Sequence, residues 1–235
     1  MLEESEDRYM NTRTYGQVCG LARALELVGE RWSLLIVRDL LLGPKRYPDL
    51  LRGLPRMPAG ILSARLNELE SAGVIRRRVL PELDAAVVYE LTEYGSELDE
   101  VVLRLGLWGA RSLAPHAGDI FTLDSAILSL YSTFRPEAAV GVHVVYELHH
   151  SAHLVVHALV EDGALKAAEG GYPEADLVIR QHEPVILGLL TGQLSPADAV
   201  AGGQLSIEGA IEHLELFTEL FHIPAGPMTS AGRAA

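Results

Sequence analysis

The chain has 235 residues and a formal net charge of −13, with 49% hydrophobic and 22% charged residues. This length and composition can bury the core of one large or two modest domains, which excludes a disordered chain. No apolar run approaches the roughly 18 residues that a membrane-spanning helix requires. The first residues are acidic rather than signal-like, so we expect a soluble, cytoplasmic protein with no membrane partner.

The charge is unevenly distributed along the chain. Residues 1–113 hold 15 Lys and Arg against 17 Asp and Glu, for a net charge of −2, whereas residues 114–235 hold 4 against 15, for −11. Residues 13–80 alone carry +6. This distribution excludes one homogeneous domain and leaves open a basic nucleic-acid reader joined to an acidic sensor. The predicted parts are a flexible N-terminal segment at 1–14, a first domain at 15–113, a linker at 114–119, a second domain at 120–224 and a flexible tail at 225–235.

The first domain is expected to be mainly helical. Apolar residues recur at helical spacing over residues 20–42, which predicts two helices with a break at Gly29. A short third helix is predicted at residues 47–52, and a fourth at residues 58–72, where Gly73 ends it.

The fourth helix has two different faces. One is an apolar stripe of Ile61, Leu62, Leu66 and Leu69. The other carries the small or polar side chains of Ala59, Gly60, Ser63, Ala64 and Asn67, with Arg65 at the margin. Such a slim face can approach base-pair edges in the major groove, and an ordinary amphipathic helix with a solvated face is the alternative.

A basic β-hairpin follows this helix. Two β-prone runs, at residues 74–80 and 87–91, flank a predicted turn at residues 81–84. Arg76 and Arg78 should point to one face of the first strand and Arg77 to the other. Alone, three arginines could be a solvated charge run, but after a helix-turn-helix they predict a wing that contacts phosphates. The predicted DNA-binding surface also includes Lys45, Arg46 and Tyr47.

Thr92 can cap a further helix, whose apolar stripe needs cover. The stripe consists of Leu98, Val101, Val102, Leu105 and Trp108. It can pack on its own domain or on a second subunit, and we favour the second subunit. Two-fold symmetry would place the two recognition helices about 34 Å, or a multiple of it, apart on DNA.

The first domain resembles HxlR-type (DUF24) winged helix-turn-helix transcriptional regulators. Residues 15–25, 29–32, 38–43, 62–66, 69–70, 72–75 and 89–95 carry the resemblance, in the family's order. It implies a bacterial homodimer whose first and last domain helices form the interface. The paired recognition helices would read a pseudo-palindromic operator on double-stranded DNA.

Cys19 is the single cysteine, which excludes an internal disulfide and a multi-cysteine zinc site. In some HxlR-type members a cysteine at the matching place senses electrophiles or oxidants, often followed by a proline where this chain has Gly20. Reactive thiols lie beside helix N-termini or basic residues, and Arg23 follows one turn on. A packed, inert side chain is the alternative.

The second half reads as strands followed by helices, which predicts an α+β fold. The predicted strands are 140–148, 152–161, 164–169, 176–180 and 205–207, and the helices are 120–134, 184–190, 196–201 and 210–221. His149, His150 and Ser151 are placed at the tip of the first hairpin. His153 and His157 would lie about 13 Å apart on a strand, too far for one metal ion, so we expect no metal site.

Part of this half looks like a sterol carrier protein 2-like (SCP2-like) domain. The matching segments are 175–179, 188–192, 195–199, 203–209 and 216–221. The resemblance implies a sheet backed by helices around an apolar tunnel for a lipid-like or other hydrophobic small molecule. The expected ligand-binding residues are Phe121, Ile127, Leu130, Tyr131, Phe134, Leu189, Leu190, Phe217 and Phe221.

No catalytic motif is found, neither a G-x-S-x-G elbow, nor a glycine-rich phosphate loop, nor a His-Glu-x-x-His pair, so we expect no enzyme and no cofactor. The fold prediction is a mainly α winged helix-turn-helix domain followed by an α+β SCP2-like domain. The predicted function is a homodimeric, DNA-binding repressor whose affinity responds to a hydrophobic small molecule. The alternatives are a redox or electrophile sensor acting through Cys19, and a lipid or small-molecule carrier.

Overall fold

The computed structural model describes residues 14–80, 86–116 and 118–226. The chain divides into two compact units, with the boundary between Asp99 and Glu100. This boundary precedes the linker predicted at 114–119. The predicted flexible ends lie almost wholly outside the described residues, and so does the predicted turn at 81–84.

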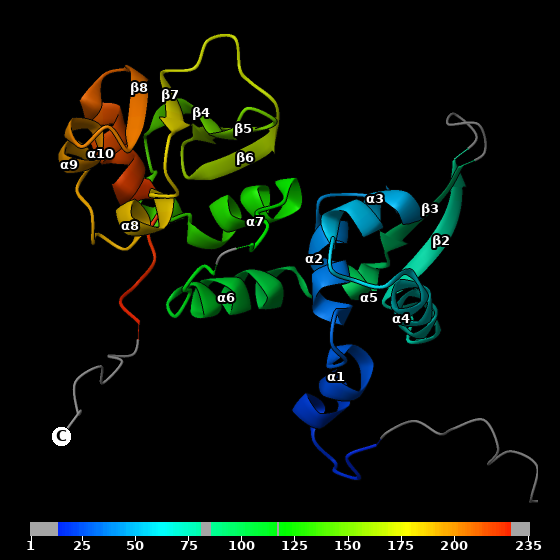
Figure 1. The fold of residues 1–235 in the computed structure, drawn as a ribbon. Helices are drawn as coiled ribbons and strands as arrows, with labels where there is room; N and C mark the ends of the chain where they lie inside the picture. The colour runs from blue at the N-terminus through cyan, green and yellow to red at the C-terminus, as the bar shows by residue number, and fades with distance from the viewer. Residues whose placement is uncertain (1–13, 81–85, 117, 227–235) are drawn as a thin grey trace, which may run out of the picture. The chain divides into compact units, whose positions relative to one another are not determined.

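The first unit combines short helices with a small antiparallel sheet (Figure 1). Its helices are α1 (Gly20–Val28), α2 (Ser33–Leu41), α3 (Tyr47–Gly53), α4 (Ala59–Ser71) and α5 (Glu93–Ser96), and its strands are β1 (Lys45–Arg46), β2 (Ile75–Leu80) and β3 (Ala86–Leu91). The strand order is β1-β3-β2. The helix-turn-helix and the wing are therefore present, while β1 is too short to have left a pattern in the sequence.

Helix α4 buries the leucines that its periodicity predicts. Leu62, Leu66 and Leu69 are buried, and Gly73 takes a left-handed φ of 71° just beyond the helix end. Ile61, predicted for the same stripe, is instead 43% exposed. One residue turns an α-helix by about 100°, so Ile61 lies well round the helix from Leu62.

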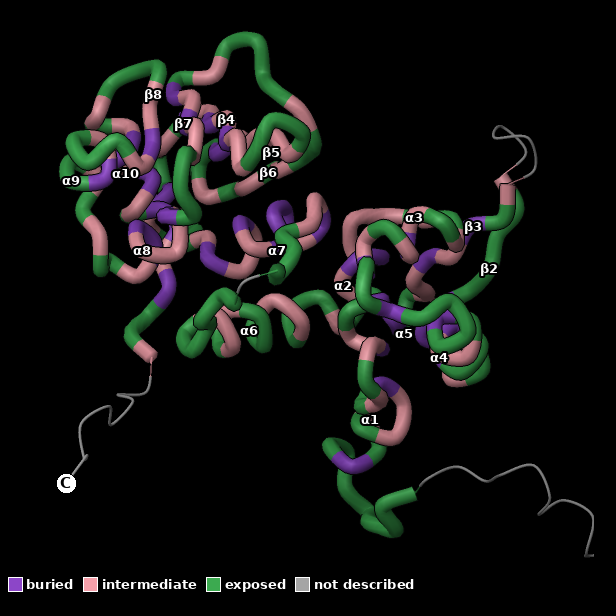
Figure 2. The backbone as a smooth tube through the Cα atoms, in the orientation of Figure 1, coloured by how far each residue is buried: buried purple, intermediate pink, exposed green. Residues whose placement is uncertain are grey.

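The helix expected after the wing is divided in two. Thr92 caps α5 as predicted, since its hydroxyl accepts a hydrogen bond from the Gly95 N–H at 3.0 Å. The chain then makes a tight turn, with the Leu98 N–H bonded to the Gly95 carbonyl at 3.2 Å, before α6 (Asp99–Ala110) begins. None of the twelve residues of α6 is buried, and Trp108 is 67% exposed (Figure 2).

The second unit is an α+β fold around a mixed five-stranded sheet. Besides α6 it contains α7 (Leu123–Thr133), η2 (Pro136–Ala138), β4 (His143–Ser151), β5 (Leu154–Glu161), β6 (Ala164–Glu169), β7 (Leu177–Gln181), α8 (Ile186–Leu190), α9 (Pro196–Ala201), β8 (Leu205–Gly209) and α10 (Ile211–Leu220). The strand order is β6-β5-β4-β7-β8, in which only the β4–β7 pair of the described strands is parallel.

The first hairpin of this sheet corrects one prediction. His149 and His150 lie within β4 rather than at its tip, because Ser151 pairs with Leu154 and only two residues form the turn. The register shifts between His149 and Ser151, and the ring of His150 lies 4.9 Å from that of Phe121. Burial lowers the pKa of His150 to about 4, so it is neutral near pH 7.

The two faces of the sheet differ. Tyr146 points to the face that α10 covers, where its ring lies 5.1 Å from Phe217 and 6.2 Å from Phe221. Its neighbours Val145 and Glu147 point to the opposite face, and both are only partly buried. The Tyr146 hydroxyl is fully buried and has no hydrogen-bond partner among the described residues.

Replacing Tyr146 with phenylalanine is expected to leave the stability unchanged or to raise it. The change removes a buried hydroxyl without a partner, which costs about 1–3 kcal/mol, and keeps the ring contacts. Urea unfolding should show an equal or higher midpoint. The control is Tyr131→Phe, which loses the hydrogen bond that the Ala167 N–H donates at 3.0 Å and should unfold earlier. A lower midpoint for Tyr146→Phe would show that its hydroxyl has a partner.

Candidate nucleic-acid interface

The start of α4 is fixed by a tyrosine from α3. The Tyr47 hydroxyl donates to the Ala59 carbonyl at 2.7 Å and lies 3.1 Å from the Ser63 hydroxyl, which itself donates to the Ala59 carbonyl at 3.2 Å. Tyr47 therefore holds the first turn of the predicted recognition helix. Ser63 keeps a local partner and stays exposed.

The outer face of α4 is as slim as the sequence suggests. Gly60, Ser63 and Asn67 are exposed and Ala64 is partly exposed. Arg65 differs from them. Its side chain is only 16% exposed, and its guanidinium forms ion pairs with Glu68 at 2.6 Å and Glu30 at 3.3 Å. The side chains that can reach a base edge without rearrangement are thus the small and polar ones.

The wing presents its arginines on both faces. Glu90 forms ion pairs with Arg76 at 2.8 Å and with Arg78 at 2.9 Å, on one face of β2 and β3. Arg77 points to the other face and forms an ion pair with Glu70 of α4 at 2.6 Å. All three arginine side chains remain at least half exposed. The alternation along the strand therefore agrees with the prediction.

Two of the carboxylates beside the basic residues, Glu70 and Asp49, have lowered pKa values. The hydrogen bond from Arg77 lowers the pKa of Glu70, and that from Arg46 lowers the pKa of Asp49. Arg46 lies 3.0 Å from Asp49, which also forms an ion pair with Arg52. Lys45 lies opposite Tyr89 in the β1–β3 pair. Arg46 and the three wing arginines are thus exposed, and each has a carboxylate partner.

Sequence reasoning identified these basic residues and missed their acidic partners. The i,i+3 spacing of Arg46 to Asp49 and of Arg65 to Glu68 is visible in the sequence. Glu90, by contrast, meets Arg76 only through the strand register.

Most of the predicted effector residues lie in or beside the interior of the second unit, and Phe121 does not. Ile127, Leu130, Leu189, Leu190, Phe217 and Phe221 are buried. Phe134 lies 5.6 Å from Phe221, so these two and Phe217 form one aromatic cluster. Tyr131 bonds to β6 through its hydroxyl. Phe121 is exposed and stands apart beside His150. Their role as ligand contacts stays a prediction.

Cys19 is exposed at the N-cap of α1. The Arg23 guanidinium, expected near the thiol, forms an ion pair with Glu26 at 3.1 Å. Among the described residues no group of three or more His, Cys, Asp and Glu is placed to hold a metal ion. Within that same part of the chain, no helix has both the length and the apolar composition needed to cross a bilayer.

A guanidinium carries five N–H donors, so one carboxylate can orient it and still leave donors for a phosphate. The slim face of α4 suits a major groove, and the wing beside it suits the DNA backbone. A winged helix-turn-helix of this kind defines a DNA-binding regulator.

Known proteins place this regulator in a family. The family model described as HxlR-like helix-turn-helix matches residues 27–117. The HTH-type transcriptional regulator YodB of Bacillus subtilis is 37% identical over 92 residues, which are 39% of this chain and 82% of YodB. The uncharacterized regulator YtcD of the same organism is 37% identical over 106 residues, 45% of this chain and 84% of YtcD. The chain belongs to the HxlR-like helix-turn-helix family.

One similar solved structure is the reduced form of YodB from B. subtilis, 35% identical, covering 43% of this chain and 99% of that chain with a TM-score of 0.37. The relatives named here are transcriptional regulators, and this chain is a transcriptional regulator of the same type.

Replacing Arg76, Arg77 or Arg78 with alanine is expected to weaken DNA binding about equally for all sequences. Each lost phosphate contact should also reduce the slope of log affinity against log salt by about 0.9. Fluorescence anisotropy on the promoter fragment of the protein's own gene measures both effects. Arg135→Ala is the control, since Arg135 is an exposed arginine of the second unit paired with Glu137. Unchanged slopes in all three variants would exclude the wing from the interface.

Proposed function

We propose that the protein is a homodimeric repressor that reads a pseudo-palindromic operator and whose affinity changes when the second unit binds a hydrophobic small molecule. The observation that carries the DNA-binding part is the exposed, slim face of α4 beside a wing with three exposed arginines. The predicted contacts are those given above for α4, the wing, Lys45, Arg46 and Tyr47.

Two exposed apolar stripes support the dimer. One stripe lies on and just before α1, where Val18, Leu21 and Leu25 are exposed at positions i, i+3 and i+7. On α6 the exposed large apolar side chains are Val101, Leu105 and Trp108. Exposed apolar stripes of this kind mark interaction sites, and in the proposed dimer a second copy of the chain covers them.

The effector part of the proposal rests on the second unit, whose mixed sheet is covered by helices. Helices α7 and α10 lie on one face of its sheet, where they enclose the aromatic cluster of Phe134, Phe217 and Phe221. The SCP2-like resemblance of its sequence agrees with this arrangement. A molecule that binds one dimer geometry better than another shifts DNA affinity by that difference.

Leu105→Asp is expected to convert the dimer into a monomer, because it buries a charge in the proposed interface. Operator affinity should fall by roughly 100-fold or more, since two linked half-site contacts become one. Light scattering coupled to gel filtration gives the mass, and anisotropy gives the affinity. The control Arg104→Ser changes an exposed polar side chain of the same helix. A dimeric Leu105→Asp protein would contradict the proposed interface.

A thiol switch is the second candidate, and the exposure of Cys19 at the start of α1 favours it. With one cysteine per chain, any disulfide must join two subunits or one subunit and a small thiol. This candidate predicts a response to oxidants that does not involve the second unit.

Under the thiol-switch candidate, diamide treatment should change the operator affinity of the unmodified protein and leave that of Cys19→Ser unchanged. Serine keeps the size and polarity of the position and removes the oxidisable atom. Anisotropy with and without diamide measures the response, and non-reducing electrophoresis shows whether a disulfide-linked dimer forms. A full diamide response in Cys19→Ser would eliminate the candidate.

A further inference from the structure

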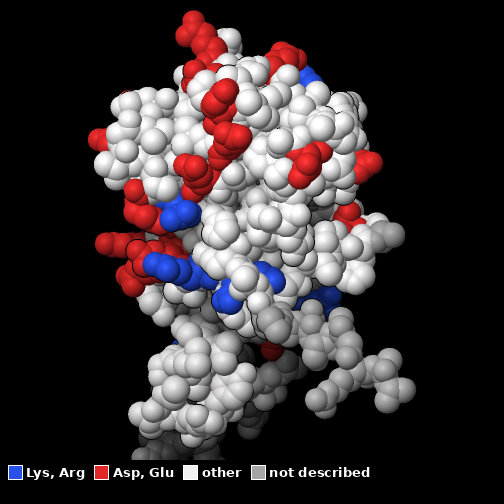
Figure 3. Space-filling model, turned by 90° about the vertical axis from the view of Figure 1, so that its left-hand side faces the viewer, with Lys and Arg blue, Asp and Glu red and all other residues white. Residues whose placement is uncertain are grey.

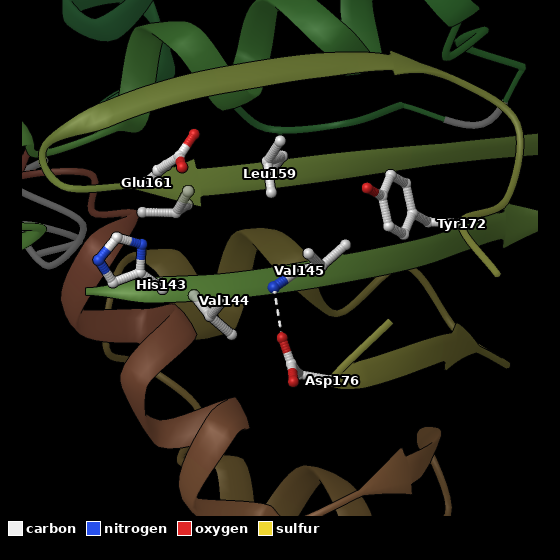
Figure 4. A pocket seen from close by; sticks show the side chains of 8 residues that line it. His143, Val144, Val145, Leu159, Glu161, Tyr172 and Asp176 are labelled. Carbon is white, nitrogen blue, oxygen red and sulfur yellow. Dashed lines mark hydrogen bonds between the residues drawn. The ribbon is translucent and has the colours of Figure 1, made fainter. Parts of the chain in front are cut away.

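A hollow of about 380 Å³ lies on the sheet of the second unit, over β4 and β5 (Figure 4). Its floor is the cross-strand pair of Val145 and Leu159. Glu161 and His143, also a cross-strand pair, lie at one end, and the ring of Tyr172 stands at the other (Figure 4). Asp176 borders the floor beside Val145, and Val144 and Val160 complete the lining. This face is opposite to the one that Tyr146 shares with α10.

The tyrosine wall of the hollow is held in place. The Tyr172 N–H donates to a Glu147 carboxylate oxygen at 2.7 Å, and the Tyr172 ring lies 5.3 Å from that of His157. His157 also contacts the Gly170 carbonyl through Nδ1 at 3.0 Å. A Cβ at Gly171 would come within 2.8 Å of a Glu147 carboxylate oxygen, so a larger residue there would require the Glu147 side chain to shift. The wall is therefore formed before any ligand arrives.

Asp176 is fixed in the same way. Its Oδ2 accepts the Val145 N–H at 2.8 Å, while its own N–H donates to the Val145 carbonyl at 2.9 Å. One edge of the carboxylate is thus bound to β4. The negative charge beside the apolar floor has a defined position.

The charged side chains that line the hollow are both acidic. Among the described residues that line it, two are carboxylates and none is Lys or Arg. Lys166 faces Leu159 from β6 but is exposed and does not line the hollow. Residues 114–235 carry 4 basic against 15 acidic residues, and Figure 3 shows acidic side chains spread over one face of the molecule. Such a field attracts a cation and repels an anion.

We propose that this hollow binds a lipophilic organic cation, a quaternary or protonated amine or a phosphonium with an aromatic body. Val145 and Leu159 cover the apolar body, the Tyr172 ring accepts a cation against its face, and Glu161 and Asp176 supply the opposite charge. The volume lies in the range of small-molecule sites, about 300–1,000 Å³. This site specifies the chemical class of effector that the second unit would bind. Only the coupling of cation binding to DNA affinity rests on the proposed function.

The test compares two ions of nearly the same size and shape, tetraphenylphosphonium and tetraphenylborate. Calorimetric titration of the full chain should show that the cation binds and that its affinity falls as salt rises. Any binding of the anion should be insensitive to changes in the hollow. Absence of cation binding, or anion binding that depends on the same residues, would overturn the proposal.

Single substitutions locate the site. Glu161→Gln and Asp176→Asn should each weaken tetraphenylphosphonium binding about two- to five-fold, and the asparagine can still accept the Val145 N–H. Lys166→Gln should strengthen binding. Glu174→Gln is the matched control, an exposed acid of the same loop that does not line the hollow. Unchanged cation affinity in both Glu161→Gln and Asp176→Asn would place the bound cation elsewhere and contradict the assignment.

A second readout separates this site from the proposed function. Operator affinity is measured by anisotropy with and without saturating tetraphenylphosphonium. Cation binding that leaves operator affinity unchanged supports the site and contradicts its effector role. Operator binding that persists without any cation binding overturns the site and leaves the DNA-binding function intact.

Discussion

Neighbouring side chains on a strand point to opposite faces of a sheet, and both proposed sites depend on this alternation. In the wing it directs Arg77 to Glu70 and the two flanking arginines to Glu90. In the second unit it turns Tyr146 into the interior and leaves Val145 on the open face, where the hollow forms. A register shift of one residue would reverse both arrangements, so strand pairing fixes the faces on which the wing arginines and the hollow lie.

The carboxylates of the winged helix-turn-helix orient its arginines more than they stabilise the fold. Ion pairs that are about half exposed contribute little to stability because water and salt screen them. They do limit the number of conformations of each guanidinium, and a phosphate can then exchange with or share the carboxylate partner. Under the proposed function, the net charge of −11 on residues 114–235 would repel DNA and favour contact through the basic first domain.

The winged helix-turn-helix was predictable in outline because glycines, prolines and helical periodicity mark its elements. The errors have different origins. Ile61 lies about 100° round α4 from Leu62 and so leaves the buried stripe. His150, which the sequence assigns to a turn, lies in β4, where the strand register shifts. The acidic partners of the wing follow from strand pairing rather than from local spacing. The hollow was not predicted. Tyr172, which forms one wall of it, lies in a loop, and a hydrogen bond to Glu147 on a strand distant in the sequence holds that loop in place.

The central claim is that two copies of the reader bind one operator through paired α4 helices. Hydroxyl-radical footprinting of the full chain on the promoter of its own gene tests this most directly. The account predicts two protected segments related by two-fold symmetry, with centres about one DNA turn, or a whole multiple of it, apart. Uniform protection along the fragment, or a single protected half-site at saturation, would contradict it.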